Sequence, residues 1–209
     1  MQNIKNIIFD YGNVIFNIDF LKAQQAWNQL GINNAADFFG HKQQDQIFDK
    51  FDRGEVSAEE FRDYIRLKSG NPKLTDEQIN AAWNSMLLGL EPGNHELLLN
   101  LKGRYRTFLL SNINAIHYDH IMNYLKTDFD FDGNDHLFEK TYYSHLTGKR
   151  KPESRIFELV LNENNLEPAE TLFIDDSPQH LAGAEKLGIQ TFLMTKPDTI
   201  QQFFKRAQL

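Results

Sequence analysis

The 209-residue sequence contains no cysteine, and none of its hydrophobic runs approaches the length of a membrane-spanning helix. The lack of cysteine excludes a disulfide framework, a thiolate nucleophile and a thiolate zinc site. The lack of a long apolar segment predicts that the chain has no membrane partner. The first residues also lack a basic stretch followed by an apolar segment, so we expect a cytoplasmic protein.

Positive charge is also scarce, with 22 Lys and Arg against 29 Asp and Glu and a formal net charge of −7. A nucleic-acid surface needs clustered Lys and Arg, so we expect no nucleic-acid partner, although a local basic pocket for a small anion is compatible with this composition. The length suits one hydrophobic core, alone or with a smaller inserted lobe. Nothing in the sequence indicates the oligomeric state.

The stretch Ile7–Val14, which reads I-I-F-D-Y-G-N-V, organises the rest of the chain. Its apolar start predicts a strand that is buried on both faces. Asp10 follows at the carboxyl end of this strand, and Gly12 allows a sharp turn of the backbone. Ligands of open parallel sheets bind outside the carboxyl ends of the strands, so Asp10 marks the expected site of chemistry.

Strands alternate with helices in the second half of the chain, where the apolar runs predict strands at 107–110, 141–144, 172–174 and 191–194. This alternation predicts an α/β fold, a three-layer Rossmann-like core with a parallel sheet between helices. Residues 19–88 contain helix signals, including two capping boxes at Ser57 and Thr75, and no convincing strand. We therefore expect a core formed by residues 1–16 and 90–209 and a helical insert formed by residues 17–89.

Three further stretches place polar groups at the ends of strands or the starts of helices. Leu109–Asn112 delivers a hydroxyl and an amide, Lys149–Pro152 is a cationic turn before a helix, and Phe173–Ser177 carries two adjacent carboxylates. If the sheet is parallel, all three stretches meet Asp10 at one edge of the sheet.

A cluster of Asp10, Asp175 and Asp176 would be repulsive, so it makes sense around a hard cation. Mg²⁺ suits such a site because it takes few carboxylates and completes its octahedron with water and substrate phosphate. Donors for the phosphoryl oxygens that the metal leaves uncovered are available from Ser111, Asn112 and Lys151.

With F-D-Y-G-N-V, L-L-S-N, K-P-E-S-R-I-F and F-I-D-D-S in this order, the sequence resembles the haloacid dehalogenase-like (HAD) hydrolase superfamily. The resemblance covers residues 1–16 and about 90–196, and the helical insert looks like the type 1 cap of that family. The form D-x-G-N-V, followed closely by F-N-I-D, is most similar to a subgroup of sugar-phosphate phosphatases that includes glucose-1-phosphatase-like members. The resemblance implies Mg²⁺-dependent hydrolysis of a small phosphorylated metabolite, such as a sugar 1-phosphate, through an aspartyl-phosphate.

The same resemblance implies a role for each motif residue. Asp10 is the nucleophile and Lys151 neutralises charge on it and on the transferring phosphoryl group. The other implied roles are phosphate binding by Ser111 with Asn112, and metal binding by Asp10, Asp176 and the Gly12 carbonyl, with Asp175 as a supporting acid.

Gly12 departs from the family pattern, because family phosphatases usually carry there a second Asp that protonates the leaving group and later activates water. General acid–base assistance contributes about 10²–10⁴-fold to a rate, so its loss would lower the rate of hydrolysis. Three interpretations follow: a substrate with an easier leaving group, which we favour; a substitute from the insert, for which Asp19 and His41 are candidates; or a chain that only binds its ligand.

Two other activities compete with phosphate hydrolysis. A metal-independent 2-haloacid dehalogenase would use Asp10 to attack a carbon that bears halogen, but the Asp175-Asp176 pair disfavours it, because that chemistry needs no metal site. A non-catalytic module that binds a phosphorylated metabolite is compatible with Gly12.

Residues 128–139 match the EF-hand calcium loop, with acids at positions 1, 3 and 5, Gly133 at position 6 and Glu139 at position 12. The segment after Glu139 reads as a strand rather than a helix, so we favour an acidic connector. His117 and His120 lie three residues apart on a predicted helix, and without an evident third ligand we expect them at the surface rather than in a zinc site. We expect His145 in a loop.

Overall fold

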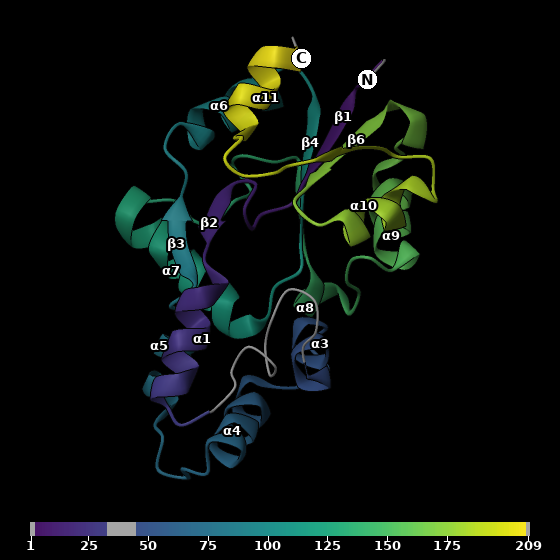
Figure 1. The fold of residues 1–209 in the computed structure, drawn as a ribbon. Helices are drawn as coiled ribbons and strands as arrows, with labels where there is room; N and C mark the ends of the chain where they lie inside the picture. Colours follow the sequence, from purple (N-terminus) through teal and green to yellow (C-terminus); the bar gives the residue numbers. More distant parts are fainter. Residues whose placement is uncertain (1–2, 33–44, 208–209) are drawn as a thin grey trace.

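A five-stranded parallel sheet forms the centre of the protein in the computed structural model, which describes residues 3–32 and 45–207 (Figure 1). The strand order is β5-β4-β1-β6-β7, so β1 lies in the middle. The strands are β1 (Asn6–Phe9), β4 (Arg106–Ser111), β5 (Lys140–Tyr143), β6 (Thr171–Asp175) and β7 (Gln190–Leu193). All four predicted strands of the second half are confirmed, with bounds shifted by one residue.

Helices cover both faces of this sheet, as the alternation of strands and helices predicts. Ile7 and Phe9 of β1 pack with residues of α6 (Asn94–Lys102), α7 (Ala115–Phe129) and α11 (Ile200–Ala207). Ile8 points to the opposite face and packs with α9 (Ser154–Asn164) and α10 (Pro178–Glu185). Successive strand residues point to opposite faces, so a short, wholly apolar strand serves two cores at once. The three-layer α/β core is confirmed.

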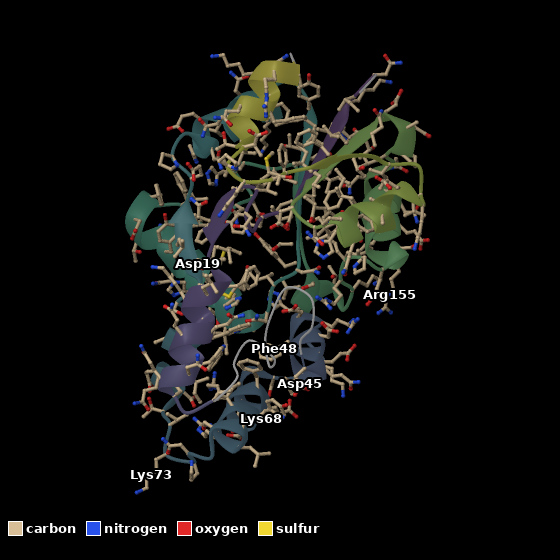
Figure 2. The ribbon with its side chains drawn as sticks, in the orientation of Figure 1. Asp19, Asp45, Phe48, Lys68, Lys73 and Arg155 are labelled. Carbon is tan, nitrogen blue, oxygen red and sulfur yellow. The ribbon has the colours of Figure 1, made fainter. Side chains whose placement is uncertain are left out.

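The helical insert contains α1 (Phe20–Gln29), α3 (Gln46–Asp52), α4 (Ala58–Ser69) and α5 (Asp76–Asn84). Asp19 caps α1, and both predicted capping boxes are present at the starts of α4 and α5. These helices share a separate hydrophobic cluster that is rich in aromatic rings, with Phe48 inside it and Lys73 at the outer end (Figure 2). The predicted helix at 35–39 lies outside the described residues.

A two-stranded antiparallel ribbon joins the insert to the core, formed by β2 (Phe16–Ile18) and β3 (Leu87–Leu90). The expectation of no strand in residues 19–88 is therefore wrong at the end of that range, where β3 begins at Leu87. Phe16 pairs with Leu90, which places the two chain crossings side by side at the predicted boundaries, 16/17 and 89/90. We accordingly propose that the core and the insert, hereafter the cap, divide at the ribbon.

Two short elements complete the fold, α8 (Ser144–Thr147) after β5 and the 3-10 turn η1 (Pro168–Glu170) before β6. The cap lies at the end of the molecule opposite the two chain termini (Figure 1). This is the end toward which the carboxyl ends of the central strands point. In the described part of the chain, no helix has both the length and the apolar character needed to cross a membrane.

Candidate active site

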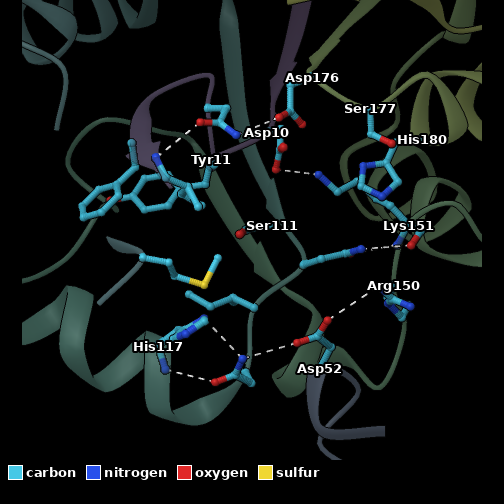
Figure 3. Close-up of a pocket in the computed structure, with 18 of the residues that line it drawn as sticks. Asp10, Tyr11, Asp52, Ser111, His117, Arg150, Lys151, Asp176, Ser177 and His180 are labelled. Atoms are coloured by element: carbon cyan, nitrogen blue, oxygen red, sulfur yellow. Dashed lines mark hydrogen bonds and ion pairs between the residues drawn. The ribbon is translucent and has the colours of Figure 1, made fainter. Parts of the chain in front are cut away.

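The carboxyl ends of the three central strands bring the predicted polar residues together. Phe9 pairs with Leu109 on one side and with Ile174 on the other, so the residues that follow are neighbours at the sheet edge. The Asp10 amide donates to the Ile174 carbonyl at 2.9 Å, which fixes the direction in which the chain leaves β1. Asp10 and Ser111 line a cavity of about 510 Å³ between the sheet and the cap (Figure 3).

Lys151 is fully buried, and its ammonium lies between two carboxylates. Nζ donates to Oδ1 of Asp10 at 2.6 Å and to Oδ2 of Asp175 at 2.8 Å. A buried ammonium is stable only when it is paired, and these two contacts supply that pairing. The predicted convergence of Lys151 on Asp10 is present in this geometry.

Asn112 holds the backbone of Lys151 at two points. The Lys151 amide donates to Oδ1 of Asn112 at 2.9 Å, and Nδ2 of Asn112 donates to the Lys151 carbonyl at 2.9 Å. Because both polar atoms of the Asn112 amide contact this backbone, we propose a positioning role for Asn112 in place of the predicted contact with phosphate.

Asp175 is buried, and both of its oxygens are engaged. Oδ1 accepts from the Ser177 amide at 2.8 Å and contacts Nδ1 of His180 at 2.9 Å, while Oδ2 accepts from Lys151. Burial would raise the pKa of Asp175, but Lys151 and His180 together hold it below its ordinary value. These contacts favour the ionised form of Asp175, and we propose that it orients Lys151 as a supporting acid.

Asp10 has the opposite electrostatic balance. Burial raises its pKa, the negative charges of Asp175 and Asp176 raise it further, and Lys151 only partly opposes these effects. One ammonium therefore does not balance the carboxylates at this edge, and a divalent cation would favour the ionised form of Asp10.

The residues present fit a magnesium ion. Oδ2 of Asp176 accepts from Nδ2 of Asn13 at 3.0 Å, which holds this carboxylate beside the cavity near Asp10 (Figure 3). Asn13 has a left-handed backbone, with φ of 55°, and its Oδ1 accepts from the Ile18 amide at 3.3 Å. The carboxylates of Asp10 and Asp176 and the Gly12 carbonyl belong to residues that line one cavity, and hard oxygen ligands of this kind suit Mg²⁺.

Asp10, Asp175 and His180 also bring potential ligand atoms within 4.8 Å of one another. Asp175 and His180 bond to each other, however, so we assign this pair to the support of Lys151. Sequence reasoning missed His180, whose only available signal is its place in the first turn of the helix after the Asp175-Asp176 pair.

The cap side of the cavity carries a second polar cluster. Asp52, at the end of α3, accepts from Nδ2 of Asn114 at 3.4 Å and lies 3.6 Å from Nη2 of Arg150. Burial raises the pKa of Asp52 to about 6, although Arg150 and Asn114 oppose the shift. Arg150 also pairs with Asp49, one turn earlier in α3.

His117 lies behind this cluster and is buried, so the expectation of a surface position is wrong for it; His120 is exposed. Nε2 of His117 contacts the Trp83 carbonyl at 3.2 Å, and Nδ1 faces Nδ2 of Asn114 at 3.3 Å. Burial lowers the pKa of His117 to about 3, so the ring is neutral, with Nε2 donating and Nδ1 accepting.

A family model described as haloacid dehalogenase-like hydrolase matches residues 4–188. The chain belongs to this family. As a HAD-like hydrolase it shares 34% identity over 193 residues with D-ribitol-5-phosphate phosphatase of Bacteroides thetaiotaomicron, covering 90% of this chain and 91% of that protein. It shares 26% identity over 191 residues with a sesquiterpene phosphatase of Aspergillus oryzae, covering 88% and 87%.

Solved structures agree with this family assignment. The magnesium complex of a HAD family enzyme from Bacteroides thetaiotaomicron has a TM-score of 0.87 and 34% identity, covering 98% of this HAD-like chain and 100% of that one. Another structure of that enzyme contains magnesium and inorganic phosphate.

Asp19 and His145, which are also predicted candidates, do not line the cavity. Asp19 accepts from the Leu21 amide as the cap of α1, and His41 lies outside the described residues. His145 lies in α8 rather than in a loop, and its Nδ1 is 3.1 Å from the Ile113 carbonyl.

The calcium loop is not formed in the described structure. Lys126 pairs with Asp130 and Asp132, and Glu139 pairs with Arg106. These contacts support the acidic connector.

Proposed function

We propose that this chain is a Mg²⁺-dependent phosphatase that hydrolyses a small sugar or polyol phosphate through an aspartyl-phosphate on Asp10. The observation that carries the proposal is the position of Asp10 on the cavity wall, with its Oδ1 held 2.6 Å from the buried ammonium of Lys151 and with Asp176 nearby. The HAD-like relatives named above, one a polyol-phosphate phosphatase and one solved with magnesium and phosphate, support it.

The proposed reaction has two steps. A carboxylate oxygen of Asp10 attacks phosphorus, and the bond from phosphorus to the ester oxygen breaks, so that the alcohol leaves with a proton taken from water in the cavity. Water then attacks the aspartyl-phosphate, which releases inorganic phosphate and regenerates the carboxylate. Lys151 neutralises charge as it develops on the phosphoryl oxygens, and the Ser111 hydroxyl faces the cavity where it can donate to them. When bound, Mg²⁺ supplies further positive charge to the same oxygens.

Gly12 bears on which ester is cleaved. A Cβ added at Gly12 would lie 2.6 Å from Cδ1 of Ile18, so the Ile18 side chain fills the space that an acid at this position would need. Without that acid, esters that leave easily are favoured, which is the reason to propose a sugar 1-phosphate. D-ribitol 5-phosphate, the substrate in the name of the HAD-like relative, is a primary alkyl phosphate and is the natural comparison.

Neither alternative has an observation of its own in its favour. A metal-independent dehalogenase needs no second carboxylate such as Asp176 beside the nucleophile. A module that only binds has no need to place a buried ammonium on Asp10.

The test is phosphate release from a panel that contains sugar 1-phosphates, D-ribitol 5-phosphate and simple alkyl phosphates, with Mg²⁺ and with chelator. Turnover that is abolished by chelator and by Asp10→Asn supports the phosphatase. Halide release from a 2-haloacid without metal, or no release from any compound with Mg²⁺ present, would contradict it. A preference for sugar 1-phosphates over D-ribitol 5-phosphate supports the leaving-group explanation of Gly12.

A further inference from the structure

The cavity has a second charged group whose bonding is incomplete. Asp52 lines the cavity from the cap, and its side chain retains only 17% exposure. In the described part of the chain, its side-chain partners are Nδ2 of Asn114 at 3.4 Å and Nη2 of Arg150 at 3.6 Å. The first contact is at the limit of a hydrogen bond and the second is beyond it. A largely buried carboxylate with such weak bonds retains acceptor capacity for a donor in the cavity.

Arg150 supplies a nearby positive charge but no short hydrogen bond to Asp52. Nη1 of Arg150 bonds directly to Asp49, so Asp52 is its more distant carboxylate. The two acidic residues on α3 therefore have different parts. Asp49 holds Arg150, while Asp52 keeps acceptor capacity on the side of the cavity.

The position of Asp52 is fixed by buried groups behind it. Nδ2 of Asn114 faces both Asp52 and Nδ1 of His117, and Oδ1 of Asn114 accepts from the His117 amide at 3.1 Å. His117 in turn bonds to the Trp83 carbonyl, and its ring stacks on the Trp83 indole at a centroid distance of 4.5 Å. This chain of contacts runs from the cap through the core helix α7 and back to the cap, so it holds Asn114 in place beside one oxygen of Asp52.

We propose that Asp52 accepts hydrogen bonds from hydroxyl groups of the substrate and selects a hydroxylated phosphate ester over an apolar one. In Figure 3, Asp52 lies across the cavity from Asp10, with Ser111 between them. An ester whose phosphate binds at Asp10 and Lys151 extends toward this carboxylate. A negative charge there repels a phosphate and favours hydroxyl donors, so it also sets the direction in which the ester binds. This inference rests on the proposed phosphatase activity.

The apolar side of the cavity is consistent with a sugar or polyol. Phe20, Phe48, Trp83 and Met86 line the cavity on the cap side together with Asp52. An apolar wall can pack against the C–H groups of a carbon chain while Asp52 bonds its hydroxyls. An unbranched alkyl or terpenoid phosphate would leave the Asp52 carboxylate buried and without a donor, which disfavours it.

The experiment compares esters that share a carbon skeleton and a leaving-group class but differ in hydroxyls. One pair is D-ribitol 5-phosphate with pentyl phosphate, and the other is myo-inositol 1-phosphate with cyclohexyl phosphate. Wild type should prefer the hydroxylated member of a pair. Asp52→Asn should lower kcat/KM for that member by about 10- to 100-fold, mainly through KM, and leave the alkyl member within about twofold. Activity on the alkyl phosphate thus shows that the variant is folded.

Asp49→Asn is the matched control, because it removes the closer partner of Arg150 from the same helix. If Asp52 acted only through Arg150, Asp49→Asn would lower the hydroxylated ester selectively by as much as Asp52→Asn, and that result would overturn the proposal. An equal loss on both members of a pair with Asp52→Asn would also overturn it. So would a loss on every alkyl and polyol ester with p-nitrophenyl phosphate spared, since that pattern marks a proton donor. No turnover by wild type on any ester with Mg²⁺ would instead refute the phosphatase itself.

Discussion

Replacing Lys151 by Met tests the electrostatics of the active site directly. Met keeps much of the length and apolar volume of the stem but removes the ammonium that bonds Asp10 at 2.6 Å and Asp175 at 2.8 Å. Removing one partner of a buried ion pair leaves an uncompensated charge and costs about 3–5 kcal/mol. Total stabilities are about 5–15 kcal/mol, so the effect is a large fraction of the free energy of unfolding.

Urea unfolding at pH 7 in chelator, without Mg²⁺, measures this effect. At a typical slope of about 2 kcal/mol per molar urea, the midpoint should fall by about 2 M. Lys149→Met is the matched control, since Nζ of Lys149 makes a long contact, 3.5 Å to the Thr147 carbonyl, and is not held between two buried carboxylates; this variant should stay within about 0.5 kcal/mol of wild type. The double variant Lys151→Met with Asp175→Asn should recover part of the loss, because one of the two stranded charges is gone.

Mg²⁺ gives a second readout of the same variant. An ion that binds the folded carboxylates stabilises the folded state by mass action, so added Mg²⁺ should raise the midpoint of Lys151→Met. Phosphatase activity should stay far below wild type, because the ion does not replace the ammonium on Asp10. A Lys151→Met protein within 1 kcal/mol of wild type in chelator would refute the reasoning, since it would mean that the carboxylates do not need this cation to remain buried.

Three further predictions concern other parts of the molecule. Gly12→Asp should hydrolyse alkyl phosphates faster than wild type, by up to about 10²-fold in kcat, because the Ile18 Cδ1 that the new Cβ would meet ends a flexible side chain and can turn aside; Gly12→Asp with Ile18→Ala should show the same gain over Ile18→Ala. The pKa of His117 is about 3 in the folded state, below its ordinary 6.5. The unfolded chain therefore binds the proton first, and the free energy of unfolding should decrease as the pH falls below 6.5, by at most about 1.4 kcal/mol per pH unit. His117→Gln should flatten the pH profile of urea midpoints in that window. Arg53→Glu and Glu153→Arg should each weaken the contact between the cap and the core, and the double exchange should restore about 1 kcal/mol in a double-mutant cycle of unfolding free energies.

The residues of the site at the sheet edge are predictable from sequence, because parallel strands place their carboxyl ends at one edge of the sheet. Asp10, Ser111 and Asp175 each follow or end an apolar run, and strands of that kind bring their carboxyl ends together wherever they lie in the chain. The sequence pattern does not reveal which atoms a side-chain amide will contact, so it does not predict that Asn112 bonds the Lys151 backbone.

The β2–β3 ribbon shows a different limit. Leu87–Leu90, L-L-G-L, lacks the β-branched and aromatic residues that favour strands, so nothing local predicts its conformation. Its ladder hydrogen bonds come from Phe16–Ile18, about seventy residues earlier in the chain. The Leu90 amide also donates to the hydroxyl of Tyr124 on α7 at 3.2 Å. Tertiary context decides this element.

The residues of the site on the cap side are not predictable from sequence either, because tertiary contacts determine where they lie. Asp52 ends α3, whereas Asn114 and His117 lie at the start of α7, more than sixty residues later in the chain. The sequence around each of these residues does not differ from that of an ordinary helix. A histidine on a helix is expected at the surface unless something buries it, and here the Trp83 indole and carbonyl do so. Contacts of this kind have no periodic signature.

The loop that carries Lys151 connects the two halves. Arg150 and Glu153 flank Lys151 closely, and both bond to α3, through Asp49 and Arg53. The cap therefore contacts the same short segment whose ammonium touches the nucleophile. Any movement of α3 away from the core must break these ion pairs or carry the loop with it. It follows that binding in the cap and the placement of charge on Asp10 are not independent, and that substitutions on α3 which disturb Arg150 or Glu153 should change kcat as well as KM.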